Sequence, residues 1–256
     1  IRDRSKWVLL VSINPGGPNG GSATQYFTGE FDGTTFIPDE QSKEIRWIDY
    51  GADNYAGVTW SDVPNEDGRK LFIGWMSNWM YANSVPTTVW RSAMTLPREL
   101  VLGSKVLKTV PALEVSQLEG EVTEMSRQEE TISSELMKVT VSNLPAGSFS
   151  LKFSSASNDQ LIVGFDAETD LLFIDRTKSG EVSFHPDFGS RHTSGSLVST
   201  PESIEIFIDR SSVEVFLNEG EMVMTDVVFP RSPYSKLSVD GLEESSVSLT
   251  PINSIW

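Results

Sequence analysis

Short apolar segments separated by polar turns run along the chain, which is the pattern expected of β-strands. Residues 7–13, which are apolar except for Ser12, predict a buried strand. Residues 24–31 and 35–37 flank an Asp-Gly pair, so they predict a hairpin. Residues 70–76 predict a further strand, which follows the polar turn 62–70. Short strands at this spacing, bounded by glycine, proline and aspartate, are typical of propellers, barrels and sandwiches.

The second half of the chain has a plainer alternation of apolar and polar positions. Residues 204–208 and 212–217 alternate with period two, which predicts half-buried strands of a sandwich. The stretch 111–125 predicts a linker or a short helix. Six of the seven tryptophans, by contrast, lie in the first hundred residues. These differences predict two β domains, residues 1–105 and residues 106–256, the second of which includes the linker.

Composition narrows the possible functions. The chain has 36 acidic and 20 basic residues, and its net charge of -16 excludes a general nucleic-acid binder, because such a surface repels phosphate. No apolar run reaches about 18 residues, so no membrane span is predicted. The absence of cysteine excludes disulfides and thiolate metal sites. The two histidines, His185 and His192, lack ligand spacing and are expected at the surface. We expect no metal and no organic cofactor.

Two clusters of aromatic and polar residues are the candidates for chemistry. Residues 47–60 contain two aspartates, two tyrosines and two tryptophans, and residues 75–91 contain three tryptophans, a tyrosine and two asparagines. A sugar site combines groups of this kind, since carboxylates accept hydroxyls and aromatic faces pack against the ring. The same residues also fit plainer roles, with Asp49 and Asp53 capping a turn and the aromatic rings filling a core. Glu214, between two valines, is expected on the solvent face of its strand.

Several segments, in their order along the chain, resemble glycoside hydrolase family 32, which contains invertases, inulinases and levanases. The matching segments are WVLLVSINPG (7–16), GSATQYF (21–27), DYGADNYA (49–56), GWMSNW (74–79), WRSAMTLPR (90–98) and FIDRSSVEVF (207–216). The resemblance covers essentially the whole chain. It implies an all-β fold, in which residues 1–105 are later blades of a five-bladed β-propeller and a β-sandwich follows.

The resemblance also implies an activity, that of a retaining glycoside hydrolase that releases fructose from levan, inulin or sucrose. The family holds its three catalytic carboxylates in Asn-Asp-Pro-Asn-Gly, Arg-Asp-Pro and Glu-Cys motifs, and none of these occurs here; the Arg2-Asp3 pair lacks the proline. We therefore expect no catalytic residue in this fragment, with the family acids upstream of Ile1. The fragment alone is expected to be inactive, with the missing N-terminal blades supplied covalently or by a partner chain.

Four residues match the substrate-binding wall of the family. Asn14 matches an asparagine near the leaving-group side of the pocket. Asp53 and Tyr55 match an Asp-x-Tyr pair that lines the terminal fructosyl subsite, and Trp79 matches the tryptophan of a Ser-Asn-Trp motif that packs beside the sugar. A fructan or fructoside is thus the expected ligand, bound by these four side chains.

Two other classes of function stay open from the residues themselves. A non-catalytic carbohydrate-binding module would have the same aromatic walls without the acids. An inert interaction sandwich is favoured by residues 112–256 taken alone. The lack of cysteine and the resemblance to fructan-degrading enzymes together predict a secreted or periplasmic protein.

Overall fold

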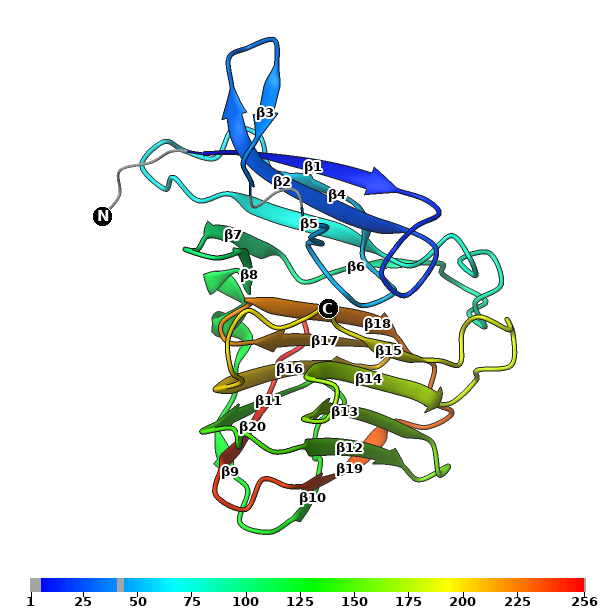
Figure 1. The fold of residues 1–256 in the computed structure, drawn as a ribbon. Helices are drawn as coiled ribbons and strands as arrows, with labels where there is room; N and C mark the ends of the chain where they lie inside the picture. The colour runs from blue at the N-terminus through cyan, green and yellow to red at the C-terminus, as the bar shows by residue number, and fades with distance from the viewer. Residues whose placement is uncertain (1–5, 41–43, 256) are drawn as a thin grey trace.

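The computed structural model describes residues 6–40 and 44–255, which fold into two all-β units (Figure 1); the Arg2-Asp3 pair lies outside these ranges. The first unit opens with a three-stranded antiparallel sheet in the order β1–β2–β3. Its strands are β1 (Trp7–Ile13), β2 (Ala23–Phe31) and β3 (Phe36–Pro38). The predicted hairpin is confirmed, and its turn is closed by Asp32, whose Oδ1 accepts hydrogen bonds from the backbone N–H groups of Thr34 and Thr35.

Strand β1 is less buried than the apolar run predicted. Trp7 is 56% exposed and Leu9 is 42% exposed. Val8 and Leu10 pack against the core of this unit, whereas the alternating residues Trp7 and Leu9 lie on the opposite face, which the described residues leave largely open. An apolar run therefore marked a strand with an open apolar side instead of one enclosed on both faces.

A second sheet of five strands completes the first unit. It has the order β4–β5–β7–β8, and β6 also pairs with β5. Its strands are β4 (Tyr55–Thr59), β5 (Leu71–Met76), β6 (Ala93–Met94), β7 (Arg98–Leu102) and β8 (Leu107–Pro111). Because β8 pairs with β7 along its length, the first unit continues to Pro111, past the expected boundary at 105.

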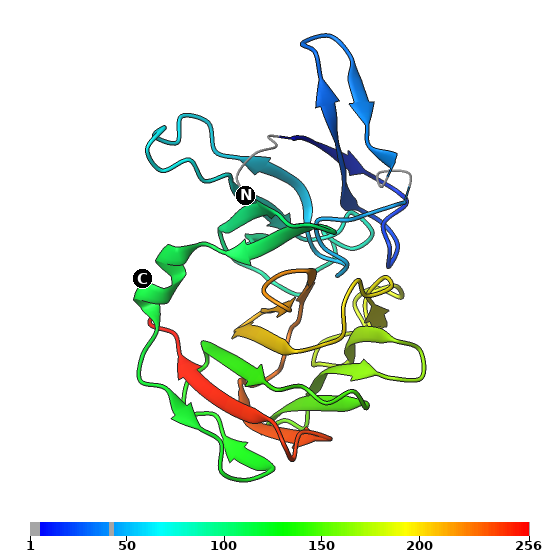
Figure 2. The same ribbon diagram turned by 60° about the vertical axis from the view of Figure 1, so that its left-hand side comes forward.

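A short 3₁₀ helix, η2 (Leu113–Leu118), connects the two units at the place predicted for a linker or short helix. It lies beside the C-terminal segment (Figure 2), and the backbone N–H of Asn253 donates to the carbonyl of Leu118. The two ends of the second unit are thereby held together at the linker.

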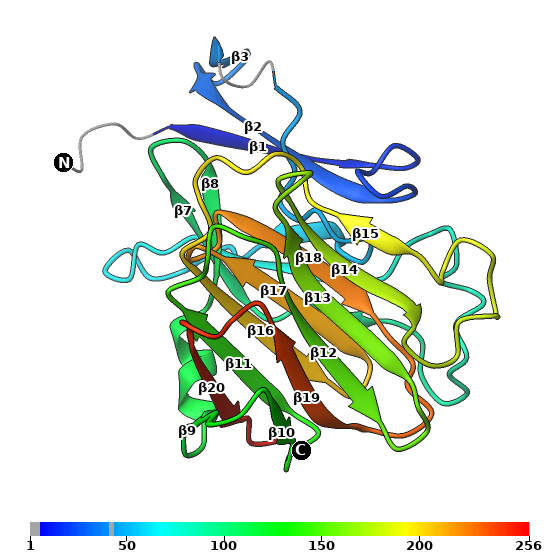
Figure 3. The ribbon, with the colours of Figure 1, turned by 60° about the horizontal axis from the view of Figure 1, so that its bottom comes forward.

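The second unit is a β-sandwich of two six-stranded antiparallel sheets, seen as two layers in Figure 3. One sheet has the order β10–β19–β12–β13–β14–β15 and the other β18–β17–β16–β11–β20–β9. The strands of the first sheet are β10 (Glu129–Thr131), β12 (Phe149–Ser155), β13 (Gln160–Asp166), β14 (Leu171–Lys178), β15 (Arg191–Thr193) and β19 (Tyr234–Asp240). Those of the second are β9 (Thr123–Glu124), β11 (Met137–Ser142), β16 (Ser203–Asp209), β17 (Ser212–Leu217), β18 (Met222–Val227) and β20 (Ser246–Pro251). Alternate residues of both sheets, such as Leu151 and Val215, meet in one shared core.

The first unit docks on the edge strand β18 of the sandwich (Figure 1). The backbone N–H groups of Tyr50 and Asp53 donate to the carbonyls of Val223 and Thr225, at 2.8 and 3.0 Å. Strands β17 and β18 are consequently buried at every position, although the sequence predicted half-buried strands in this region. Docking satisfies the backbone groups that an edge strand otherwise leaves open.

Substituting alanine for Gly51 is expected to weaken this docking. A Cβ atom at Gly51 would lie 2.2 Å from the backbone nitrogen and oxygen of Thr225, so the two units would have to move apart. We expect the free energy of unfolding, measured by denaturant titration, to fall by ~1–3 kcal/mol. Gly147→Ala is the matched control, because a Cβ atom there meets nothing within 4 Å. Equal stability of the two variants would contradict the tight contact.

Candidate functional site

A buried asparagine brings together the three loops that carry the predicted site. Asn78 follows β5 and is 0% exposed. Its Oδ1 accepts hydrogen bonds from the backbone N–H groups of Ser22, at 3.2 Å, and Met80, at 3.0 Å. Its Nδ2 donates to the carbonyls of Gly20, at 3.2 Å, and Ala52, at 2.8 Å. One side chain therefore fixes the loop after β1, the loop before β4 and the turn after β5.

Ser22 links two of the four predicted residues directly. Its hydroxyl donates to Oδ1 of Asn14 at 3.3 Å and accepts a hydrogen bond from the backbone N–H of Trp79 at 3.0 Å. Asn14 is exposed, and Trp79 is 52% exposed. Both predicted residues are thus exposed and are linked through the Ser22 hydroxyl group.

Three aromatic rings continue this surface. The rings of Trp75 and Trp79 lie 5.0 Å apart between centroids, with an interplanar angle of 47°. Tyr55 contacts Trp75 edge-on, at 6.2 Å between ring centroids. We call Asn14, Tyr55, Trp75 and Trp79 the wall. It combines one exposed and two half-buried aromatic rings with an exposed amide, and such groups can bind the apolar face and the hydroxyls of a sugar.

Asp53, the fourth predicted residue, is buried and does not belong to the wall. Its carboxylate is fully buried, and its Oδ1 accepts from the hydroxyl of Tyr81 at 2.8 Å. Its Oδ2 accepts from Nη1 of Arg176, at 2.7 Å, and from the backbone N–H of Val227, at 2.9 Å. Burial raises the pKa of Asp53 above its usual value, and Arg176 opposes that rise. The structure thus places this carboxylate against the sandwich, where no ligand reaches it without displacing Arg176.

A second buried cluster lies nearby in the same interface, around Arg98. Its Nη1 pairs with Oδ2 of Asp49 at 2.8 Å, and its Nη2 donates to Oε2 of Glu214 at 2.5 Å and to the hydroxyl of Thr225 at 2.6 Å. The solvent position predicted for Glu214 is wrong, because docking of the first unit covers that face of β17. Burial raises the pKa of Glu214, and Arg98 opposes this effect.

One of the two histidines also differs from the prediction. His192 is 3% exposed, and its Nδ1 lies 2.7 Å from Oδ2 of Asp226. The other carboxylate oxygen of Asp226 accepts from the backbone N–H of Ala52, which belongs to the first unit. Burial alone would raise the pKa of Asp226, but His192 and Arg176 hold it below its usual value. The surface position predicted for this histidine is wrong for the same reason as for Glu214.

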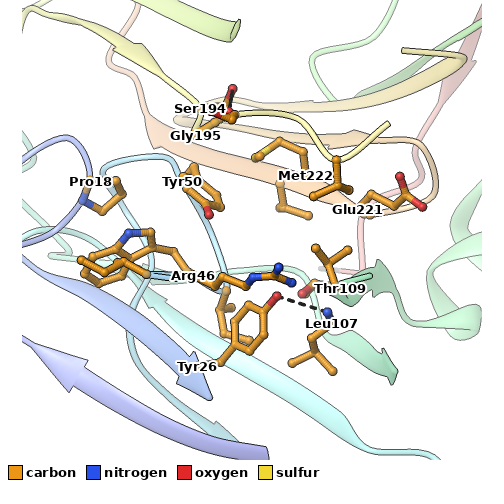
Figure 4. Close-up of a pocket in the computed structure, with 18 of the residues that line it drawn as sticks. Pro18, Tyr26, Arg46, Tyr50, Leu107, Thr109, Ser194, Gly195, Glu221 and Met222 are labelled. Carbon is orange, nitrogen blue, oxygen red and sulfur yellow. Dashed lines mark hydrogen bonds between the residues drawn. The ribbon is translucent and has the colours of Figure 1, made fainter. Parts of the chain in front are cut away.

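A separate cavity of about 520 Å³ lies where the two units meet (Figure 4). Tyr26 and Arg46 line it from the first unit, and Glu221 and Met222 line it from the sandwich, with Tyr50 between them. The three charged residues that line it have partners, because Arg46 pairs with Glu44 and Glu221 lies 3.4 Å from Lys108. None of the four predicted site residues lines this cavity.

Two further properties concern the described part of the chain as a whole. Within residues 6–40 and 44–255, no three His, Cys, Asp or Glu side chains are arranged to hold a metal ion. Over the same residues, none of the helices is both long and apolar enough to cross a bilayer.

Comparison with known proteins places this geometry in a family. The family model described as "Glycosyl hydrolases family 32 N-terminal domain" matches residues 1–111, and the one described as "Glycosyl hydrolases family 32 C terminal" matches residues 106–254. A levanase of Bacillus subtilis is 38% identical over 99% of this chain, and an extracellular exo-inulinase of Aspergillus awamori is 38% identical over 98%. The chain spans only 41% and 52% of the lengths of these two relatives.

Solved structures agree with the sequence matches. The exo-inulinase of Aspergillus awamori superposes with a TM-score of 0.84 at 32% identity, covering 98% of this chain and 54% of that one. A fructofuranosidase of Schwanniomyces occidentalis, solved in complex with fructose, superposes with a TM-score of 0.80 at 27% identity, covering 98% and 58%. Since two models of one family account for nearly all of the sequence, and solved relatives share its fold, the chain belongs to glycoside hydrolase family 32.

Proposed function

We propose that this chain forms the sugar-binding wall of a retaining β-fructosidase, which releases fructose from levan, inulin or sucrose. The observation that carries the proposal is the convergence at Asn78, which joins the separate loops bearing Asn14, Tyr55 and Trp79. These are three of the four residues that match the family's substrate wall, and their open faces suit a furanose ring. The names of the relatives, levanase and exo-inulinase, support a fructan as the substrate.

The chemistry of a retaining hydrolase needs two carboxyl groups about 5–5.5 Å apart, one as nucleophile and one as acid and then base. The carboxyl groups beside the wall do not fit that task. Asp49 and Asp53 are buried and bonded to arginines, so neither reaches a sugar. We therefore place the catalytic carboxylates on a segment outside this chain, and the role of the wall is to orient the ring toward them.

We also propose that the first unit is one part of a larger propeller. The two sheets of the first unit are later blades of a five-bladed propeller, and the earlier blades cover the open apolar side of β1, where Trp7 and Leu9 are exposed. These blades are supplied covalently or as a partner chain. Secretion also belongs to the proposal, and it is supported by the extracellular exo-inulinases among the relatives.

Binding of a fructo-oligosaccharide tests the proposed function. Trp79→Ala is expected to weaken binding, measured by titration calorimetry, about tenfold or more, because it removes an open aromatic face from the wall (about 1.4 kcal/mol per tenfold). Trp60→Ala is the control, since Trp60 is 45% exposed and lies outside the wall. Equal losses in both variants, or no binding by the unmodified chain, would contradict the proposal.

A hydrolysis assay distinguishes the proposed enzyme from the alternative, a non-catalytic carbohydrate-binding module. The chain alone is expected to release no reducing sugar from sucrose, inulin or levan, because the described residues provide no suitable carboxyl pair beside the wall. Placed behind the N-terminal segment of the Bacillus subtilis levanase, it should support hydrolysis that Trp79→Ala lowers. Sugar binding with no hydrolysis in a folded chimera would favour the non-catalytic carbohydrate-binding module.

A further inference from the structure

We infer that Arg176, on β14 of the sandwich, is a positioning residue for the wall. The sandwich is then part of the machinery that shapes the sugar site and not an appended domain. This inference rests on the proposed function for its ligand, but its geometry stands independently.

The guanidinium of Arg176 is fully buried and closes a triangle with two groups of the first unit. Nη1 donates to Oδ2 of Asp53 at 2.7 Å, and Nη2 donates to the hydroxyl of Tyr81 at 2.8 Å. That hydroxyl in turn donates to Oδ1 of Asp53 at 2.8 Å. On its own side, Nε donates to the carbonyl of Phe188 at 2.8 Å and Nη1 to that of Val227 at 3.0 Å. The side chain is therefore anchored in the sandwich and reaches two loops of the other unit.

Each of these loops carries one of the exposed or half-exposed rings of the wall. Asp53 is followed closely by Tyr55, which begins β4. Tyr81 lies in the turn that contains Trp79, and the backbone N–H of Tyr81 donates to the carbonyl of Asn78 at 3.1 Å. The guanidinium thus ties the loop of Tyr55 to the turn of Trp79 from the sandwich side, in addition to the bonds of Asn78 within the first unit. Any shift of one relative to the other changes the angle at which their rings meet a sugar.

Arginine is required because the two contacts diverge from one planar group. The guanidinium donates along fixed directions to several acceptors at once, whereas a lysine ammonium is a point charge. The ring of Phe188 also lies 4.0 Å beneath the guanidinium carbon, and the ring of Tyr81 lies 5.2 Å from it. A lysine at this position keeps the charge beside Asp53 but loses the simultaneous bond to Tyr81 and the stacking.

The test uses the pair of tryptophans as an internal gauge. Trp75 and Trp79, 5.0 Å apart and tilted by 47°, should give an exciton couplet in the circular dichroism spectrum, which Trp79→Phe identifies by removing it. Arg176→Lys is expected to reduce this couplet and to weaken fructo-oligosaccharide binding about tenfold. Val163→Ala is the control, since Val163 is a fully buried core residue of β13, so the variant loses stability without a contact to the wall.

The outcomes separate a positioning role from a structural one. An unchanged couplet and affinity in folded Arg176→Lys, or the same changes in Val163→Ala at equal stability, would overturn the inference. Tyr81→Phe removes only the shared hydroxyl and decides the question if Arg176→Lys fails to fold, because it should reduce the couplet by itself. A failure of the proposed function would give a different result. Trp79→Ala would then bind the sugar as well as the unmodified chain does, and the couplet would still show whether Arg176 positions the two tryptophans.

Discussion

Replacing Arg98 by methionine is expected to lower the free energy of unfolding by about 3–5 kcal/mol, because it leaves buried carboxylates without their partner. Arg98 is 0% exposed and bridges Asp49 of the first unit to Glu214 of the sandwich, at 2.8 and 2.5 Å. Methionine fills much of the same volume, so the loss comes from charge and not from a cavity. Denaturant titration of the intact chain measures it.

Arg210→Met is the control for this prediction. Arg210 also pairs with a carboxylate, that of Glu135, but the two side chains are 77% and 42% exposed, so solvent screens the pair and the loss should be below about 1 kcal/mol. The pH dependence gives a second check. The folded-state pKa of Glu214 is already raised by burial, and without Arg98 it rises further. A raised carboxyl pKa penalises folding as pH rises from the unfolded value, so the deficit of Arg98→Met should shrink toward low pH. A deficit independent of pH would contradict the assignment to buried charge.

Asn78→Ala is expected to cost about 2–4 kcal/mol and to disturb the wall at the same time. The variant removes the partner of four backbone groups, those of Gly20, Ser22, Ala52 and Met80. An unsatisfied buried polar group costs about 1–3 kcal/mol, and water reaches the less buried ones. Denaturant titration measures the stability, and the couplet of the paired tryptophans reports on the wall.

Asn83→Ala is the matched control for Asn78→Ala, because Asn83 lies in the same turn but is exposed. It should leave both stability and couplet unchanged. If the two alanine variants behave alike, Asn78 is not the residue that joins the three loops.

Local features of the fold could be predicted from the sequence because they depend on neighbouring residues. The Asp-Gly turn closes the β2–β3 hairpin through bonds within a few residues, and the short helix η2 lies inside the stretch predicted for a linker. Burial could not be predicted in the same way. Alternation between Val213 and Val215 assigns Glu214 to the outer face of its strand, and only docking of the first unit turns that face into an interface.

In the candidate site, too, residues in local motifs could be predicted, whereas residues that depend on distant contacts could not. Asn14, Tyr55 and Trp79 were found through motifs that resemble a family, and the structure brings their loops together. The residues that hold them, Asn78 and Arg176, were missed. Asn78 stood in a matched motif, but its buried position depends on two other loops. Arg176 lies 123 residues from its partner Asp53, and no local pattern records such a pair.

The interface also determines the order in which contacts form while the chain is synthesised and folds. Asp49 lies 176 residues before its partner Thr225, and contacts of this separation close late, after the entropy of a long loop has been lost. During synthesis the loop that contains Asp49 and Asp53 leaves the ribosome long before β18, so the bonds that Thr225 and Val227 donate to these carboxylates form last. A chain that stops before β18 keeps the bonds of Asn78 within the first unit but lacks the strand on which that unit docks. The interface side of these loops therefore gains its full set of bonds only after β18 has been synthesised.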